Sequence, residues 1–134
     1  QGGKWSAQAA NDYMATILPE YSEANGNMVE LIICNNDGMA EGAVSALQGA
    51  GYNTGDGKTI PVFGVDATDS AKQLINEGKM TGTIKQDAEG MASTILNLVS
   101  SVQGGGELMD NTSSFNVDEG VAKIRVPYAT YTGE

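Results

Sequence analysis

Histidine is absent from this 134-residue chain, and cysteine occurs only once, at Cys34. A Ser-His or Cys-His catalytic pair therefore cannot form within the chain, and a zinc site is not expected. Cys34 lies in an apolar run, where a free cysteine usually behaves as a small buried hydrophobe. No run of 18 apolar residues is present, so the sequence predicts no membrane-spanning helix.

Basic residues are also scarce, with Lys and Arg together 7 against 17 Asp and Glu, for a net charge of −10. Binding to a phosphate backbone needs clustered basic residues, so nucleic acid is not an expected partner. Three prolines and 18 glycines predict many turns in one domain's length of chain. The start at Gln1-Gly2-Gly3 is unlike a natural N-terminus, so we expect a cut there, and the missing signal peptide says nothing about export.

Apolar periodicity predicts strands that alternate with helices. The helices are expected at 5–18, at 38–48, after a cap at Thr68 or Asp69, and at 87–102. The strands are expected at 29–34, 60–65 and 80–84, followed by extended segments at 113–117 and 121–131 joined by a turn at 118–120. This order predicts an α/β fold with a parallel sheet that helices cover on both faces.

Each predicted strand is followed by an amide or a carboxylate side chain: Asn36, Asp66 and Gln86. Ligands of open α/β sheets bind in the crevice outside the carboxyl ends of the strands. Amides and carboxylates pair with hydroxyl groups as donors and acceptors. The pattern therefore predicts a binding cleft for a polyhydroxylated small molecule.

Each of these residues has a structural alternative. Asn36 or Asp37 is expected to cap the following helix, with Asp37 the preferred cap and Asn36 open between a turn and a ligand contact. Asp66 could instead be a phosphorylation or magnesium site, but no companion acids and lysine stand out. Gln86 alone would be an ordinary surface residue. Trp5, the only tryptophan, is either a core residue or an exposed face for a sugar ring.

Several stretches together form a specific combination: 35–44 (NNDGMAEGAV), 60–67 (IPVFGVDA), 82–84 with 87–88, 125–128, and the opening Trp5, Gln8, Ala9, Asp12 and Met14. This combination resembles the galactose/glucose-binding proteins of bacterial ABC-type sugar importers, within the periplasmic binding protein type I superfamily. The resemblance implies two α/β lobes that are joined by three crossings and close over a sugar.

The resemblance also implies roles for individual residues. Trp5 matches the indole that stacks on the sugar, and Asn36 and Asp66 match polar contacts to its hydroxyl groups. Gln86 stands where the galactose/glucose-binding proteins have asparagine. Glu30 matches their late calcium ligand, whose partner loop is not in this chain, and an outward-facing strand residue is the alternative. No cofactor is expected for this chain by itself, and calcium is expected only in a longer protein.

The match covers only the C-terminal stretch of the family pattern. Residues 1–85 would be the remainder of the C-terminal lobe, 86–109 a hinge crossing and a helix of the N-terminal lobe, and 110–134 the final crossing and an extended tail. Such an incomplete lobe exposes the edge of strand 29–34, which predicts self-association. One lobe cannot close over its ligand, so weak or absent sugar binding is expected for this stretch alone.

The leading hypothesis is a solute-binding protein that captures a glucose- or galactose-like monosaccharide for an ABC importer. Its expected partners are the importer's membrane subunits, with a chemoreceptor as an optional one. Its expected location is extracytoplasmic, in the periplasm or on the cell surface as a lipoprotein. The alternative is the effector-binding domain of a LacI-type regulator. An enzyme is least expected, because no phosphate-binding loop follows a strand and no acid cluster with a lysine is found.

Overall fold

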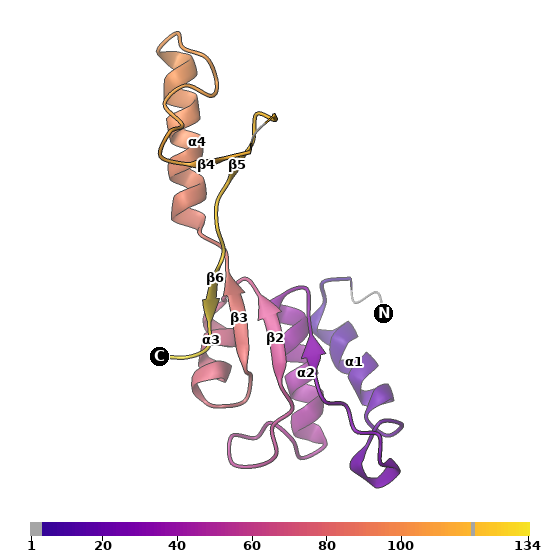
Figure 1. Cartoon of the computed structure of the whole chain (residues 1–134). Helices are drawn as coiled ribbons and strands as arrows, with labels where there is room; N and C mark the ends of the chain where they lie inside the picture. Colours follow the sequence, from indigo (N-terminus) through magenta and orange to yellow (C-terminus); the bar gives the residue numbers. More distant parts are fainter. Residues whose placement is uncertain (1–3, 119) are drawn as a thin grey trace. The chain divides into compact units, whose positions relative to one another are not determined.

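The computed structural model describes residues 4–118 and 120–134 and divides the chain into two compact units (Figure 1). The first unit extends to Lys85 and includes Thr130–Glu134, and the second comprises Gln86–Ala129. Gln1, Gly2, Gly3 and Glu119 lie outside the described residues, so the expected cut at the N-terminus and the middle residue of the predicted 118–120 turn do too. The assignment of residues 1–85, 86–109 and 110–134 to lobes and crossings of a longer protein stays a prediction.

A four-stranded sheet forms the centre of the first unit, with the strand order β1-β2-β3-β6. The strands are β1 (Ile32–Ile33), β2 (Val62–Val65), β3 (Gly82–Lys85) and β6 (Ala129–Tyr131). β1 pairs parallel to β2, and β2 pairs parallel to β3. In Figure 1 the arrow of β6 points opposite to that of β3. The carboxyl ends of β1, β2 and β3 therefore meet at one edge of the sheet.

The helices of the first unit begin at side-chain caps. They are α1 (Ala7–Ile17), α2 (Asp37–Gly49) and α3 (Asp69–Asn76), with a short 3-10 turn, η1 (Glu23–Asn25), after α1. Ser6, Asn36 and Thr68 each accept a hydrogen bond from a backbone N–H of the first turn, which satisfies one of the otherwise unpaired donors there. For α3 this decides between the two predicted caps, because Thr68 is the cap and Asp69 is the first helical residue.

The core of the first unit lies between the helices and one face of the sheet. Val44 and Leu47 of α2 and Val62 of β2 are fully buried there, and Cys34 is buried beside them as predicted. Burial also raises the pKa of the Cys34 thiol, because desolvation disfavours the thiolate. The α/β class and its parallel strand pairing are thus confirmed.

The first strand is shorter and more exposed than the sequence predicts. Residues 29–34 were expected to form a buried strand, but β1 covers only Ile32 and Ile33, and Ile33 is 74% exposed. Ile32 and Cys34 donate their backbone N–H groups to residues 61 and 63, so β1 is paired on that side and ends the sheet on the other. The exposure of Leu31 and Ile33 shows that the two-sided helix covering expected from apolar strands is not present at β1.

The second unit contains α4 (Ala88–Gln103) and a hairpin of β4 (Asn116–Val117) and β5 (Ile124–Arg125), which pair antiparallel. Asp87 caps α4 through a hydrogen bond from the backbone N–H of Gly90. The carboxylate of Asp118 lies 2.7 Å from the guanidinium of Arg125. Among the described residues, no helix is long and apolar enough to cross a membrane.

Candidate functional site

The candidate site of the first unit lies where its parallel strands end. Asn36 follows β1 and Asp66 follows β2 directly, and these two strands are neighbours in the sheet. The structure therefore brings Asn36 and Asp66 to the same edge, as the sequence predicts. This is the edge at which ligands of open α/β sheets bind.

Asn36 combines a structural task with a place at this edge. Its side-chain oxygen accepts a 2.9 Å hydrogen bond from the backbone N–H of Met39, so Asn36, not Asp37, is the cap of α2. The preference for Asp37 as the cap is wrong because the chain turns into the helix one residue earlier. The cap also fixes the half-buried Asn36 side chain at the tip of β1.

Asp37 has a different role, which the sequence did not reveal. It is the first residue of α2 and is fully buried, with 0% exposure. Its Oδ1 accepts a 2.6 Å hydrogen bond from the hydroxyl of Thr83, and its Oδ2 accepts a 2.8 Å hydrogen bond from the backbone N–H of Thr68. One carboxylate thus joins the start of α2 to β3 and to the segment after β2.

Asp66 lies at the tip of β2 in an unusual backbone conformation. Its φ is +117°, and the next residue, Ala67, has a φ of +54°. Residues other than glycine rarely adopt positive φ, and such residues gather at functional sites. The side chain of Asp66 is exposed, and its backbone N–H donates to the carbonyl of Ile84 in β3.

Trp5 is exposed at the same end of the first unit. It is 67% exposed and directly precedes Ser6, the cap of α1, so the core alternative for its indole is wrong. The carbonyl of Ala7 lies close to Gly42 of α2, and both helices start at the end where the strand arrows point (Figure 1). An exposed indole at this end of the unit offers a large apolar face to a ligand.

Gln86 and Glu30 are less firmly connected to this edge. Gln86 directly follows β3 but belongs to the second unit, so it is described with that unit. Glu30 is exposed, as the alternative interpretation predicted, but it lies before β1 and not within the strand. No group of three or more His, Cys, Asp or Glu side chains within 4–118 and 120–134 could hold a metal ion. The role of Glu30 as a calcium ligand stays a prediction.

Another hollow lies far from the strand tips. An apolar groove of about 580 Å³ runs between the C-terminal halves of α1 and α2 and is lined by residues such as Leu18, Ala46 and Tyr52. Its lining residues include no carboxylate and no amine, and the phenol of Tyr52 is their one titratable group. The strand-tip edge, with its amide, carboxylate and indole, has the chemistry that a hydroxyl-rich ligand needs.

Comparison with known proteins decides the family. Residues 1–107 match the sequence model of the periplasmic binding protein domain, which is most of the chain. The chain belongs to this family. The resemblance carried by 35–44, 60–67 and the later stretches is thereby confirmed.

Individual relatives agree with this membership. The chain is 34% identical over 126 residues to the D-galactose/methyl-galactoside binding periplasmic protein of Haemophilus influenzae, covering 94% of this chain and 34% of that protein. A solute-binding protein of an ABC transporter from Actinobacillus succinogenes, solved with D-allose, shares 25% identity with a TM-score of 0.70 and covers 97% of this chain and 38% of its own. One from Bacillus halodurans C-125, solved with myo-inositol, shares 28% identity with a TM-score of 0.68, at 97% and 38% coverage.

These relatives are named as binding proteins for sugars and a polyol, and none of the three is named as a repressor or an enzyme. They favour the importer hypothesis over the LacI-type regulator. The chain spans about a third of the length of the curated relatives it matches.

Proposed function

We propose that the chain is part of a solute-binding protein that captures a glucose- or galactose-like monosaccharide for an ABC importer. The observation that carries the proposal is the strand-tip edge of the first unit. There Asn36 and Asp66 follow neighbouring parallel strands, and an exposed Trp5 precedes a helix that starts at the same end.

The chemistry of these three groups suits a sugar. The carboxylate of Asp66 accepts hydrogen bonds from two hydroxyl groups, and the amide of Asn36 offers a donor that its capping bond does not use. The indole of Trp5 covers the C–H face of a pyranose ring. Capture and release of a sugar involve no covalent step, so we assign no catalytic residue.

Gln86, which directly follows β3, is proposed as a fourth contact to the sugar. Its amide is one methylene longer than the asparagine of the galactose/glucose-binding proteins, so we expect the preferred sugar to differ in the group that faces it. D-galactose, D-allose and myo-inositol, the ligands named for the relatives, set the range to test first.

The proposal also implies the partners and the location of the protein. The protein would work outside the cytoplasm, in the periplasm or tethered as a lipoprotein, and would deliver its sugar to the membrane subunits of the importer. A chemoreceptor is an optional further partner of the sugar-loaded protein. Calcium would bind only where Glu30 is joined by acidic and amide groups from outside this chain.

Isothermal titration calorimetry of the protein at its natural length tests the proposal. The wild type should bind one of D-galactose, D-glucose, D-allose or myo-inositol with one site per chain. Asp66→Ala should weaken that binding by about a hundredfold, since hydrogen bonds to a charged group are worth about 1.5 to 3 kcal/mol. Asn36→Ala should weaken it less.

The matched control is Asp56→Ala, which removes an exposed carboxylate from the loop between α2 and β2. We expect no change in sugar affinity from it. Equal losses from Asp56→Ala and Asp66→Ala, or no heat with any of the sugars, would contradict the proposal.

Self-association of the 134-residue chain is proposed from the free edge of β1. Its backbone groups pair with β2 on one side only, and Leu31 and Ile33 are exposed beside them. Such an edge is a template for another strand. Light scattering after size-exclusion chromatography should show a dimer or larger species that Ile33→Lys converts to monomer, and a monomeric wild type would refute this.

A further inference from the structure

Asp37 and Thr83 form a buried pair between the strands and the helices of the first unit. The Asp37 side chain reaches from the start of α2 past Gly64 of β2 to the hydroxyl of Thr83 in β3, 2.6 Å away. Gly64 makes this path possible, because a Cβ there would lie 2.3 Å from Oδ1 of Asp37. We call Asp37 and Thr83 the clasp.

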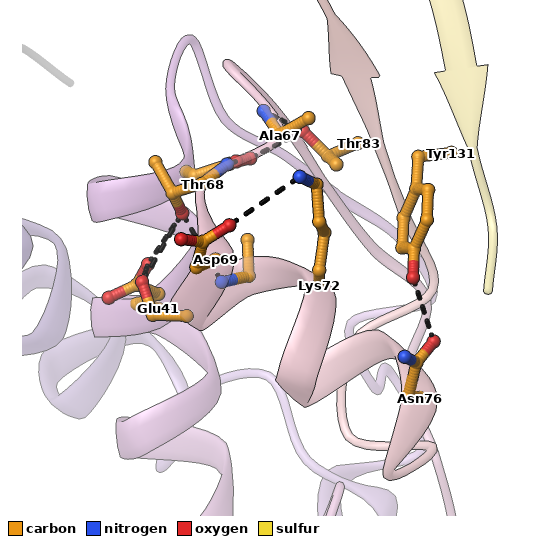
Figure 2. A network of polar contacts seen from close by, with 11 residues as sticks. Glu41, Ala67, Thr68, Asp69, Lys72, Asn76, Thr83 and Tyr131 are labelled. Atoms are coloured by element: carbon orange, nitrogen blue, oxygen red, sulfur yellow. Dashed lines mark hydrogen bonds and ion pairs between the residues drawn. The ribbon is translucent and has the colours of Figure 1, made fainter. Parts of the chain in front are cut away.

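The clasp holds two successive backbone N–H groups after Asp66. The N–H of Ala67 donates to the Thr83 hydroxyl at 3.3 Å, and the N–H of Thr68 donates to Oδ2 of Asp37 at 2.8 Å. Figure 2 shows Thr83 beside Ala67 at this turn. Both members of the clasp are at most 3% exposed, so the acceptor side chains of Asp37 and Thr83 are shielded from water.

The segment that the clasp holds would not keep its shape by itself. Asp66 and Ala67 both have positive φ, a strained backbone conformation for residues other than glycine. A second tie lies at the surface, where Glu41 of α2 accepts hydrogen bonds from the hydroxyls of Ser70 at 2.6 Å and Thr68 at 3.3 Å (Figure 2). The surrounding contacts therefore impose the turn on these residues.

We propose that the clasp positions the Asp66 carboxylate for the sugar, so that Asp37 and Thr83 are positioning residues of the binding site. The inference rests on the proposed function, because it assumes that Asp66 contacts the ligand. It goes beyond that function by assigning part of the affinity to two buried residues behind the site. Holding the turn before the ligand arrives lowers the cost of ordering it on binding.

Thr81 offers a matched control for Thr83 on the same stretch of chain. Its hydroxyl also accepts a hydrogen bond from a backbone N–H, that of Val62 at 3.1 Å, but at the other end of the pairing between β2 and β3. Thr83→Val and Thr81→Val each remove one hydroxyl and keep the side-chain shape. A purely structural role predicts similar effects of both on sugar affinity.

The experiment measures three properties of the protein at its natural length for the wild type, Asp37→Asn, Thr83→Val, Thr83→Ser and Thr81→Val. These are thermal stability, affinity for the sugar bound most tightly by the wild type, and amide hydrogen exchange at Ala67 and Thr68. We expect Thr83→Val and Asp37→Asn to weaken binding about tenfold and to speed exchange of both amides. Thr83→Ser should restore binding to within about threefold, and Thr81→Val should lower stability while changing affinity less than about twofold.

Equal losses of affinity in Thr83→Val and Thr81→Val, or full affinity in Thr83→Val, would overturn the proposal. Unchanged exchange at Ala67 and Thr68 in Asp37→Asn would overturn it as well. If the wild type binds none of the sugars, the proposed function fails and the ligand part of this inference fails with it. The exchange rates then still show whether the clasp holds the turn, so the two failures can be told apart.

Discussion

The two units bury their apolar residues to very different extents. In the first unit, α2 places Ala43, Val44 and Leu47 against the sheet with 1% exposure or less. In the second unit, the longer helix α4 has Thr94 as its buried residue, while Ile95 is 61% exposed. Both helices have an apolar stripe in the sequence, and among the described residues that of α2 is buried while Ile95 and Val102 of α4 are exposed.

This contrast separates a helix that is covered within its own unit from one whose apolar side chains are exposed. An apolar stripe at helical spacing predicts a buried face, and an exposed apolar stripe marks an interaction surface. The chain spans about a third of its curated relatives, so the remainder of such a protein is a natural cover for α4. The predicted assignment of 86–109 to another lobe would supply that cover.

The largest expected effect comes from the same substitution in the two units. Ile75→Ala removes a 6% exposed side chain from α3 and should lower the free energy of unfolding of the 134-residue chain by about 2 to 5 kcal/mol. Ile95→Ala in α4 should change it by less than about 0.5 kcal/mol. Urea denaturation followed by circular dichroism measures both.

The natural-length protein sharpens this comparison. There we expect Ile95→Ala to become costly, by about 2 kcal/mol or more, since α4 would be covered. If Ile95→Ala changes the free energy of unfolding equally little in the 134-residue chain and in the natural-length protein, α4 has no covering partner there.

A second pair compares asparagines. Asn53 is fully buried, donates to the carbonyls of Ile60 and Lys79 and accepts from the N–H of Ile60. Asn53→Ala leaves these backbone groups unpaired and places alanine at φ +52°, so it should cost about 3 kcal/mol. Asn97 of α4 makes one exposed hydrogen bond, and Asn97→Ala should cost less than about 1 kcal/mol. Similar costs in a thermal melt would show that the first unit is not the better packed one.

Close packing of α1 on α2 gives an intermediate effect. A Cβ at Gly42 would lie 2.0 Å from the carbonyl oxygen of Ala7, so Gly42→Ala should push the helices apart and cost about 1 to 3 kcal/mol. Gly49→Ala, near the end of the same helix, meets nothing within 4 Å and should be neutral or slightly stabilising. If Gly42→Ala is as harmless as Gly49→Ala in urea denaturation, the two helices do not pack as described.

The smallest effect concerns the hairpin of the second unit. A hydrogen bond from Arg125 lowers the pKa of the Asp118 carboxyl below its ordinary value of 3.8. The stabilisation is therefore present above that value and is lost as the pH falls through the lowered pKa. An NMR titration of Asp118 should show this shift, and Arg125→Gln should return the pKa towards 3.8. An unshifted pKa in the wild type would mean that the pair does not form in solution.

Local patterns predicted most of the first unit and the helix of the second unit. Caps and apolar stripes located all four helices to within a few residues, and the strand tips located Asn36 and Asp66, because these features depend on neighbours in the sequence. The extent of β1 and the place of β6 beside β3 could not be predicted, since they depend on pairing between distant segments. The burial of Asp37 is a tertiary property as well, because its partners Thr68 and Thr83 lie 31 and 46 residues away.

The account depends above all on sugar contact at the strand-tip edge of the first unit. The most direct test records the tryptophan fluorescence of the natural-length protein and of Trp5→Phe during titration with the sugars named above. The difference between the two signals isolates Trp5. A saturable change in that difference with one sugar, together with weaker binding by Trp5→Phe, is the predicted result. A sugar response that is identical in both proteins, or no response to any sugar, would contradict the account.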